Sequence, residues 1–234
     1  VSAVAGSGAS ANLAADQVFN SASTQDIDSA YDKSTDRLVV IYRSSSTLYA
    51  EVGQINSDGT ITFGTAATVV SGDYPGTICY DENTSRILIC YRGASSYGYG
   101  VVGTVTGGST NTIAIGSATA FWNSGAIENV NIGLAYYASG TASVVAFQID
   151  YGAYSGLARM ATITGGGTNT VAFGTEITLN SGRTRYLERG VFYDPDTERV
   201  VACYMDWDSS ENGYARIINN TSGTVLQAED EYEF

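Results

Sequence analysis

One phrase of about fourteen residues recurs along this 234-residue chain and limits the folds that the chain can adopt. It joins an aromatic residue and a turn to a run of apolar residues, and it occupies 30–43, 79–92 and 192–204, with a weaker copy at 135–147. The tyrosines that mark the four copies are 49, 56 and 57 residues apart: Tyr31, Tyr80, Tyr136 and Tyr193. A period of about 50 residues is typical of arrays of small sheets, such as propeller blades.

Each repeat can be divided into four strands, and the first repeat shows the division best. Its first strand is expected to end at Tyr31. Its second, third and fourth strands are expected to cover 37–43, about 47–55 and about 60–70. The second strand is apolar on both faces, which suits a middle strand packed between neighbouring sheets. Because no stretch carries a 3.6-residue period, we predict almost no helix.

These strands predict an all-β fold, a β-propeller-like array of four-stranded antiparallel blades within a single domain, 1–234. The repeats cover about 24–72, 73–125, 126–182 and 183–234, and 1–23 form an orphan outer strand. We favour a closed ring in which this strand latches beside the last blade. Two alternatives are open: the chain belongs to a larger ring, or the orphan strand pairs with a neighbouring subunit.

The turn residues fit this division into strands. Asp32 is placed to accept backbone N–H groups in an Asx turn and to pair with Arg37 across the hairpin. Cys79, Cys90 and Cys203 all fall on expected strands, where we interpret them as small buried hydrophobic residues. Their odd number argues against a disulfide scaffold, although a Cys79–Cys90 bridge between adjacent strands is an open alternative.

Composition excludes several classes of function. The chain has 24 acidic and 11 basic residues, a net charge of -13, a single lysine and no histidine. A surface of this charge repels nucleic-acid phosphates, so we expect no nucleic-acid partner. The missing histidine removes His-based triads and His-ligated metals. No apolar run approaches the ~20 residues of a membrane-spanning helix, so we expect no membrane insertion.

Variable loops on one side of the array carry the candidate binding residues. They follow the second and fourth strands of each repeat, and they combine aromatic rings with polar groups, as sugar recognition requires. The candidate ligand residues are Tyr74, Tyr97, Asp150, Tyr151, Tyr154, Arg185, Tyr186, Asp206, Trp207 and Asp208. We expect no metal and no cofactor. The best carboxylate set for Ca²⁺ would be Asp26, Asp28, Asp206 and Asp208, brought together only if a four-bladed ring closes.

The recurring phrase resembles a tandem propeller repeat of marine bacteriophage tail-fibre and virion proteins. The residues that carry the resemblance are 80–92, Tyr99-Gly100, 103–105, 173–175 and 180–182, and it extends over nearly the whole chain. It implies a virion structural or host-attachment role and transfers no catalytic residue. The third repeat departs from the pattern, with Tyr137, Ala142 and Gln148 at positions that carry Asp, Arg and Arg elsewhere.

These arguments predict a non-catalytic virion protein, such as a tail fibre, that binds a host-surface glycan or another virion protein. We expect a homo-oligomer, with other virion or filament subunits as partners, in a virion or extracellular setting. One alternative is a secreted or cell-surface adhesive protein that forms filaments by sharing strands. Another is a propeller glycosidase, for which Asp150, Asp206 or Glu128 can be nominated but no pair is singled out.

Overall fold

Four antiparallel sheets make up the protein. The computed structural model describes residues 16–72, 74–137, 142–149, 154–164, 169–222 and 225–234. Within them, the only helical segments are two three-residue 3-10 turns, η1 (Ala94–Ser96) and η2 (Leu187–Arg189). Each sheet takes its strands from one of the four sequence repeats, so the all-β prediction is confirmed.

The strands follow one another in chain order. The first sheet contains β1 (Gln25–Asp32), β2 (Arg37–Ser44), β3 (Thr47–Ile55), β4 (Ile61–Phe63) and β5 (Ala67–Ser71). The second contains β6 (Gly76–Asp81), β7 (Arg86–Arg92), β8 (Gly98–Thr106), β9 (Thr112–Ile115) and β10 (Thr119–Trp122). The third contains β11 (Ile127–Tyr137), β12 (Ala142–Ile149), β13 (Gly156–Thr164), β14 (Thr170–Phe173) and β15 (Ile177–Asn180). The fourth contains β16 (Thr184–Arg185), β17 (Val191–Asp194), β18 (Arg199–Asp206), β19 (Asn212–Ser222) and β20 (Val225–Glu233).

The outer strand of the first three sheets is split in two. Both β4 and β5 pair with β3, and the same arrangement recurs with β9 and β10 on β8, and with β14 and β15 on β13. The predicted continuous strand at about 60–70 is therefore wrong, because the chain leaves the ladder at Gly64. In the fourth sheet the first strand is divided instead, as β16 and β17 both pair with β18.

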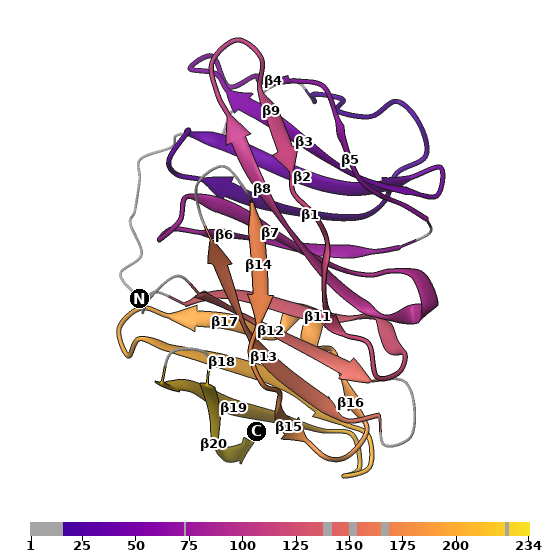
Figure 1. Ribbon diagram of the computed structural model, residues 1–234, viewed down its shortest axis with the longest axis vertical. Coiled ribbons are helices and arrows are strands. Elements are labelled where there is room, and N and C mark those ends of the chain that lie inside the picture. The colour runs from indigo at the N-terminus through magenta and orange to yellow at the C-terminus, as the bar shows by residue number, and fades with distance from the viewer. Residues whose placement is uncertain (1–15, 73, 138–141, 150–153, 165–168, 223–224) are drawn as a thin grey trace, which may run out of the picture.

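The sheets stack face to face along the long axis of the molecule, from the indigo sheet to the yellow strands (Figure 1). An apolar core fills each of the three spaces between consecutive sheets. The middle strand β7 is apolar throughout because both of its faces are buried. Ile87 and Ile89 pack toward the first sheet, while Leu88 and Cys90 pack toward the third. Burial of both faces of such a strand supplies the hydrophobic stabilisation of the stack.

The array does not close into a ring. Among the described strands, the first and fourth sheets lie at opposite ends of the stack and share no extensive contact (Figure 1). The outer face of the first sheet is already covered by the segment before β1, where the Phe19 ring lies 5.0 Å from that of Tyr42 and 5.7 Å from that of Phe63. Residues 16–23 of the predicted orphan strand form no strand, and 1–15 lie outside the described residues.

The recurring tyrosines of the second strands stack on an aromatic partner in the third strand. Ring centroids are 5.6 Å apart in Tyr42–Tyr49, 5.9 Å in Tyr91–Tyr99 and 6.1 Å in Tyr204–Tyr214. Each pair is directly opposite in the strand register, where side chains contact most closely. Tyr42, Tyr91 and Tyr204 are buried, whereas Tyr31 at the end of β1 is exposed.

The turn between the first and second strands is an Asx turn. The Asp32 carboxylate accepts the N–H of Ser34 at 2.8 Å and that of Thr35 at 3.3 Å, and Asp81 and Asp194 accept from the equivalent positions. The expected Arg37–Asp32 pair does not form. Instead, the Arg37 guanidinium donates to the backbone carbonyls of Thr35 and Asp36 and reaches into the next sheet.

An asparagine links the first two sheets at this turn. Asn111, directly before β9, accepts from Arg37 Nε at 2.8 Å and donates to the Thr62 carbonyl at 3.0 Å. Gly64 fits beneath it, since a Cβ on Gly64 would lie 2.0 Å from the Asn111 carbonyl oxygen. We call this arrangement the asparagine latch. It consists of an arginine of one sheet, an asparagine of the next sheet that bonds to it, and a glycine whose missing side chain leaves space for the asparagine backbone.

The second latch joins the second and third sheets in the same way. Asn169 accepts from Arg86 Nε at 3.3 Å and from Thr104 Oγ1 at 2.5 Å, and it donates to the Ala114 carbonyl at 3.2 Å. A Cβ on Gly116 would lie 2.1 Å from the Asn169 carbonyl oxygen. Asn111 and Asn169 both have a φ of 43°, a left-handed conformation that asparagine tolerates better than most residues.

The three cysteines are free, so the Cys79–Cys90 bridge is not formed. Cys90 is buried, as predicted, whereas Cys79 and Cys203 are only partly buried. Burial raises the pKa of the Cys79 thiol to about 12 and that of Cys90 well above its usual value. These thiols are therefore protonated at neutral pH and serve as packing groups.

A buried carboxyl on the outer face of the first sheet gives a pH-dependent prediction. Glu51 is 4% exposed and accepts a hydrogen bond from Tyr42 Oη at 3.0 Å. Burial raises the pKa of Glu51, and the hydrogen bond from Tyr42 lowers it by less. Because the folded state binds this proton more tightly than the unfolded state, ionising Glu51 costs stability as pH rises through its folded pKa.

We expect Glu51→Gln to remove this cost. At pH 7 the melting temperature should rise by about 2–4 °C, and the difference should vanish at about pH 3, below the usual pKa of glutamate of about 4.3, where wild-type Glu51 is protonated in both states. Asp58→Asn is the opposite control, since hydrogen bonds from the Thr60 side chain and backbone lower the pKa of Asp58. It should lose stability at neutral pH. Equal melting temperatures of wild type and Glu51→Gln at pH 7 would contradict the argument.

Candidate functional site

The loops that follow the second strands and the links between sheets lie on one side of the stack, as an antiparallel meander requires. At the end of the stack formed by the third and fourth sheets, these loops gather four large side chains. We call them the arginine–aromatic cluster: Tyr154, Arg183, Arg185 and Trp207. Tyr154 precedes β13, Arg183 precedes β16, Arg185 lies in β16, and Trp207 follows β18.

The four side chains are layered by cation–π contacts. The Arg183 guanidinium carbon lies 5.1 Å from the ring centroid of Tyr154 and 5.1 Å from that of Trp207. The Arg185 guanidinium carbon lies 4.5 Å from the Trp207 centroid. Tyr154 and Trp207 are 37% and 39% exposed, so solvent and ligands reach both rings. Aromatic faces at such distances attract a guanidinium by about 0.5–1 kcal/mol at exposed sites.

Backbone hydrogen bonds fix the loops that carry the cluster. The Trp207 N–H donates to the Arg183 carbonyl at 2.8 Å, and the Thr184 N–H donates to the Tyr154 carbonyl at 3.1 Å. The Arg183 N–H donates to Asp208 Oδ2 at 2.9 Å. Arg183 and Arg185 are two residues apart across an extended segment, which places their side chains on the same side. The cluster is therefore positioned by the fold before any ligand arrives.

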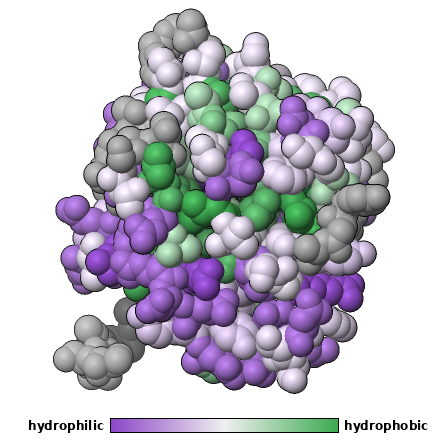
Figure 2. Space-filling model, turned by 60° about the horizontal axis from the view of Figure 1, so that its bottom comes forward, coloured by the Kyte–Doolittle hydropathy of each residue, from purple (hydrophilic) through white to green (hydrophobic). Residues whose placement is uncertain are grey.

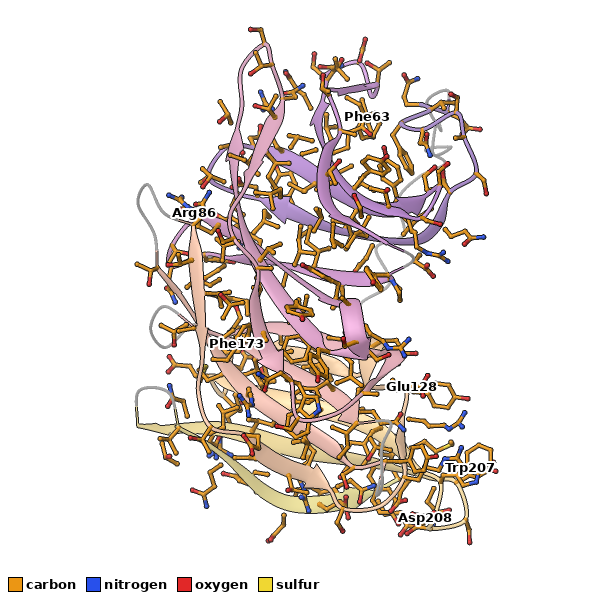
Figure 3. The ribbon with its side chains drawn as sticks, turned by 45° about the vertical axis from the view of Figure 1, so that its right-hand side comes forward. Phe63, Arg86, Glu128, Phe173, Trp207 and Asp208 are labelled. Carbon is orange, nitrogen blue, oxygen red and sulfur yellow. The ribbon has the colours of Figure 1, made fainter. Side chains whose placement is uncertain are left out.

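The carboxylates beside the cluster accept hydrogen bonds from the turn itself. Asp206, 8% exposed, accepts the Asp208 N–H at 3.0 Å and the Ser209 hydroxyl at 3.1 Å. Both aspartates pack over Gly182, where a Cβ would lie 2.9 Å from Asp206 Oδ1 and 3.3 Å from Asp208 Oδ2. Asp206 and Asp208 thus shape the loop that presents Trp207. Figure 3 shows Trp207 and Asp208 together at this end of the molecule.

The predicted calcium set is not assembled. Asp26 pairs with Arg43 at 2.5 Å, and Asp28 accepts from Thr77 Oγ1 at 2.9 Å and from the Ile78 N–H at 3.1 Å, all at the end of the stack away from Asp206 and Asp208. The prediction depended on ring closure, which brings the first and last sheets together. Within the described residues, no three acidic, cysteine or histidine side chains gather in a way that could hold a metal ion.

The remaining predicted residues are dispersed. Tyr74 packs against the core between the first two sheets, and Tyr97 ends the turn between β7 and β8. Tyr186 follows Arg185 with a left-handed φ of 67° and is 57% exposed. Asp150 and Tyr151 lie outside the described residues. Arg183, which contacts both rings of the cluster, was missing from the predicted set, although its spacing of two from Arg185 was a usable signal.

The two arginines of the cluster differ from the other described cations. Toward the other described residues their guanidinium groups make ring contacts only. Nε of both is buried without a hydrogen-bond acceptor there, as is Nε of Arg92, Arg159 and Arg216. Elsewhere in the described residues, cationic side chains bond to an acceptor, such as Glu82, Asp26, Ser96, Glu176, Glu229 or the Leu179 carbonyl. Two guanidinium groups without an ion-pair partner among the described residues thus lie over the same ring, in a chain whose net charge is -13.

A groove of about 730 Å³ lies between the outer strands β15 and β20. Two of its charged groups are engaged, because Arg216 donates to the Leu179 carbonyl at 2.5 Å and Glu231 accepts from the Tyr204 hydroxyl, although Nε of Arg216 has no acceptor among the described residues. Figure 2 brings this end of the molecule forward and shows hydrophilic residues over the lower part of the face, below a band of apolar residues. The arginine–aromatic cluster, which combines two exposed rings with two guanidinium groups that have no described ion-pair partner, is the better candidate site.

Comparison with models of protein families and with curated proteins finds no match. In the described part of the chain, no helix has the length and apolar character that crossing a bilayer demands.

Proposed function

We propose that the protein is a non-catalytic attachment module of a virion, such as part of a tail fibre, that binds a glycan on the host surface. In this proposal the four sheets are blades of an open, propeller-like arc. The arginine–aromatic cluster is the binding site. The proposal places the protein in a virion because the repeat phrase resembles that of tail-fibre proteins, and it places the ligand at the cluster because of the cluster's chemistry.

The observation that carries the glycan proposal is the pair of accessible rings beside unused hydrogen-bond donors. Sugars present C–H faces that stack on aromatic rings and hydroxyls that accept from N–H groups. Tyr154 and Trp207 supply the rings, and Arg183 and Arg185 supply the donors. Because backbone hydrogen bonds hold the loops in place, binding immobilises few groups that are free beforehand.

A glycan microarray with the purified full chain tests this function. We expect binding to a restricted set of saccharides, and Trp207→Ala should weaken the affinity at least tenfold, about 1.4 kcal/mol, since central aromatic residues dominate such sites. Trp207→Phe should retain part of the affinity, because a smaller ring still stacks. Isothermal titration with a bound saccharide gives the affinities.

Trp122→Phe is the matched control. Trp122 also lies beneath an arginine, with the Arg159 guanidinium carbon 5.8 Å from its ring centroid, but Arg159 is paired with Glu176. We expect this variant to bind like wild type. Equal losses from Trp122→Phe and Trp207→Phe, or a wild-type array without any bound saccharide, would contradict the proposal. The expected homo-oligomer stays a prediction, which light scattering of the same protein would check.

A further inference from the structure

We infer that the saccharide bound by the arginine–aromatic cluster is acidic, with a carboxylate or sulfate group that Arg183 and Arg185 hold together. The inference rests on the proposed glycan-binding function and adds the chemical class of the ligand. Its starting point is that the guanidinium groups of both arginines form no hydrogen bond or ion pair with a residue that the structure describes.

Unused guanidinium donors make a neutral ligand the poorer match. Each guanidinium has five N–H donors and no acceptor, and a buried donor without a partner costs about 1–3 kcal/mol. A neutral sugar offers single hydroxyl oxygens, whereas a carboxylate or sulfate offers several charged oxygens to one fork of donors. Charge-assisted, bidentate contacts of this kind are about twice as strong as neutral hydrogen bonds.

The rings hold the arginines in a suitable orientation. A guanidinium that stacks on an aromatic face keeps its N–H bonds in its own plane, where they can reach past the edge of the ring. Trp207 contacts both arginines, and Tyr154 contacts Arg183. An oxyanion at the edge of this stack would contact both forks, while the sugar ring to which it is attached lies over the exposed aromatic surface.

The charge of the protein makes this local pair the feature that decides specificity. With a net charge of -13, the chain as a whole repels acidic polysaccharides at long range. Screening reduces that repulsion beyond about 8–10 Å at physiological salt, while contacts within the cluster persist. Acidic saccharides should therefore bind only where the two arginines are close enough to contact the oxyanion.

The test is an array on which uronate-, sialate- and sulfate-bearing saccharides are each placed beside a carboxyl-reduced or desulfated counterpart. We expect the bound saccharides to be acidic and to lose at least tenfold in affinity on neutralisation. Comparing the carboxylate-bearing saccharides with the sulfate-bearing ones on this array shows which of the two acidic groups the protein binds. Binding of neutral counterparts as tightly as the acidic forms overturns the acidic ligand but leaves glycan binding intact. No bound saccharide of either kind overturns both.

Variants of the two arginines assign the effect to the cluster. Arg183→Gln and Arg185→Gln should each weaken binding of the acidic saccharide about tenfold and leave its neutral counterpart unchanged. Arg185→Lys keeps the charge but not the fork, and it should lose part of the affinity while the melting temperature stays at the wild-type value. Arg199→Gln, at a turn on the opposite side of the stack, is the control and should bind normally. Wild-type binding by Arg183→Gln and Arg185→Gln would overturn the inference.

Discussion

Replacing Gly64 by alanine is expected to destabilise the protein by about 3 kcal/mol, because the added methyl group has no space. The Cβ would lie 2.0 Å from the Asn111 carbonyl oxygen and 2.7 Å from that of Thr110, both of them backbone atoms of the next sheet. Backbone cannot rotate away as a side chain can, so the first two sheets must separate or the turn before β9 must move. Urea denaturation monitored by far-UV circular dichroism measures the loss.

Gly107→Ala is the matched control for Gly64→Ala. Gly107 lies in the same turn region, its φ is not positive, and the nearest atoms to an added Cβ are 3.5 Å away. Its stability should stay within about 0.5 kcal/mol of wild type, as for ordinary surface substitutions. Truncating Asn111 should not rescue Gly64→Ala, since the clash is with backbone. A rescue by Asn111→Ala, or equal stability of the two alanine variants, would show that the contact is not the cause.

The features that the sequence predicted well are local. The strand expected at about 47–55 is β3, and the Asx turn at Asp32 forms because a carboxylate two residues before an N–H can reach it in any such turn. Tyr42, Tyr91 and Tyr204 recur with the strand that carries them, a pattern typical of packing residues, and all three are buried. Each of these features depends on residues that are close along the chain or directly opposite in a hairpin.

The features that the sequence did not predict depend on how one repeat sits on the next. Gly64 and Asn111 belong to different repeats. From the sequence alone, Phe63-Gly64-Thr65 is equally compatible with one continuous strand. The direction of Arg37 follows from the same contact, because Asn111 offers a buried acceptor and Asp32 is already occupied by its turn. A repeat period defines the repeated sheet but not the rotation from one sheet to the next. The predicted ring closure was wrong because it depends on that rotation.

The candidate site shows the same division. Trp207 and Tyr154 were selected because exposed aromatic residues in loops are common binding groups, and Arg185 was selected with them. What no local pattern could provide is the layering of Arg183 between Tyr154 and Trp207, which brings together three different loops. This layering requires the third and fourth sheets to stack in register, so the site depends on the packing between sheets as much as on the loops.

The double variant Asn111→Gly with Asn169→Gly is expected to lose about 3 kcal/mol of stability, the sum of two similar losses at separate interfaces. Each asparagine binds an arginine of the preceding sheet and a backbone carbonyl of its outer strand, and each substitution leaves a buried or half-buried arginine without that acceptor. Glycine accepts the left-handed φ of 43°, so backbone strain does not add to the loss.

The first repeat provides the control for this double variant. Gly59 occupies the equivalent turn position before β4, with a φ of 84°, and no described strand precedes the first sheet for an asparagine to contact. Gly59→Asn should therefore change stability by less than about 0.5 kcal/mol. Guanidinium denaturation of the single and double variants tests additivity. If the double variant unfolds at the wild-type midpoint, or if Gly59→Asn gains as much as the double variant loses, the asparagines act through turn propensity and not through contacts between sheets.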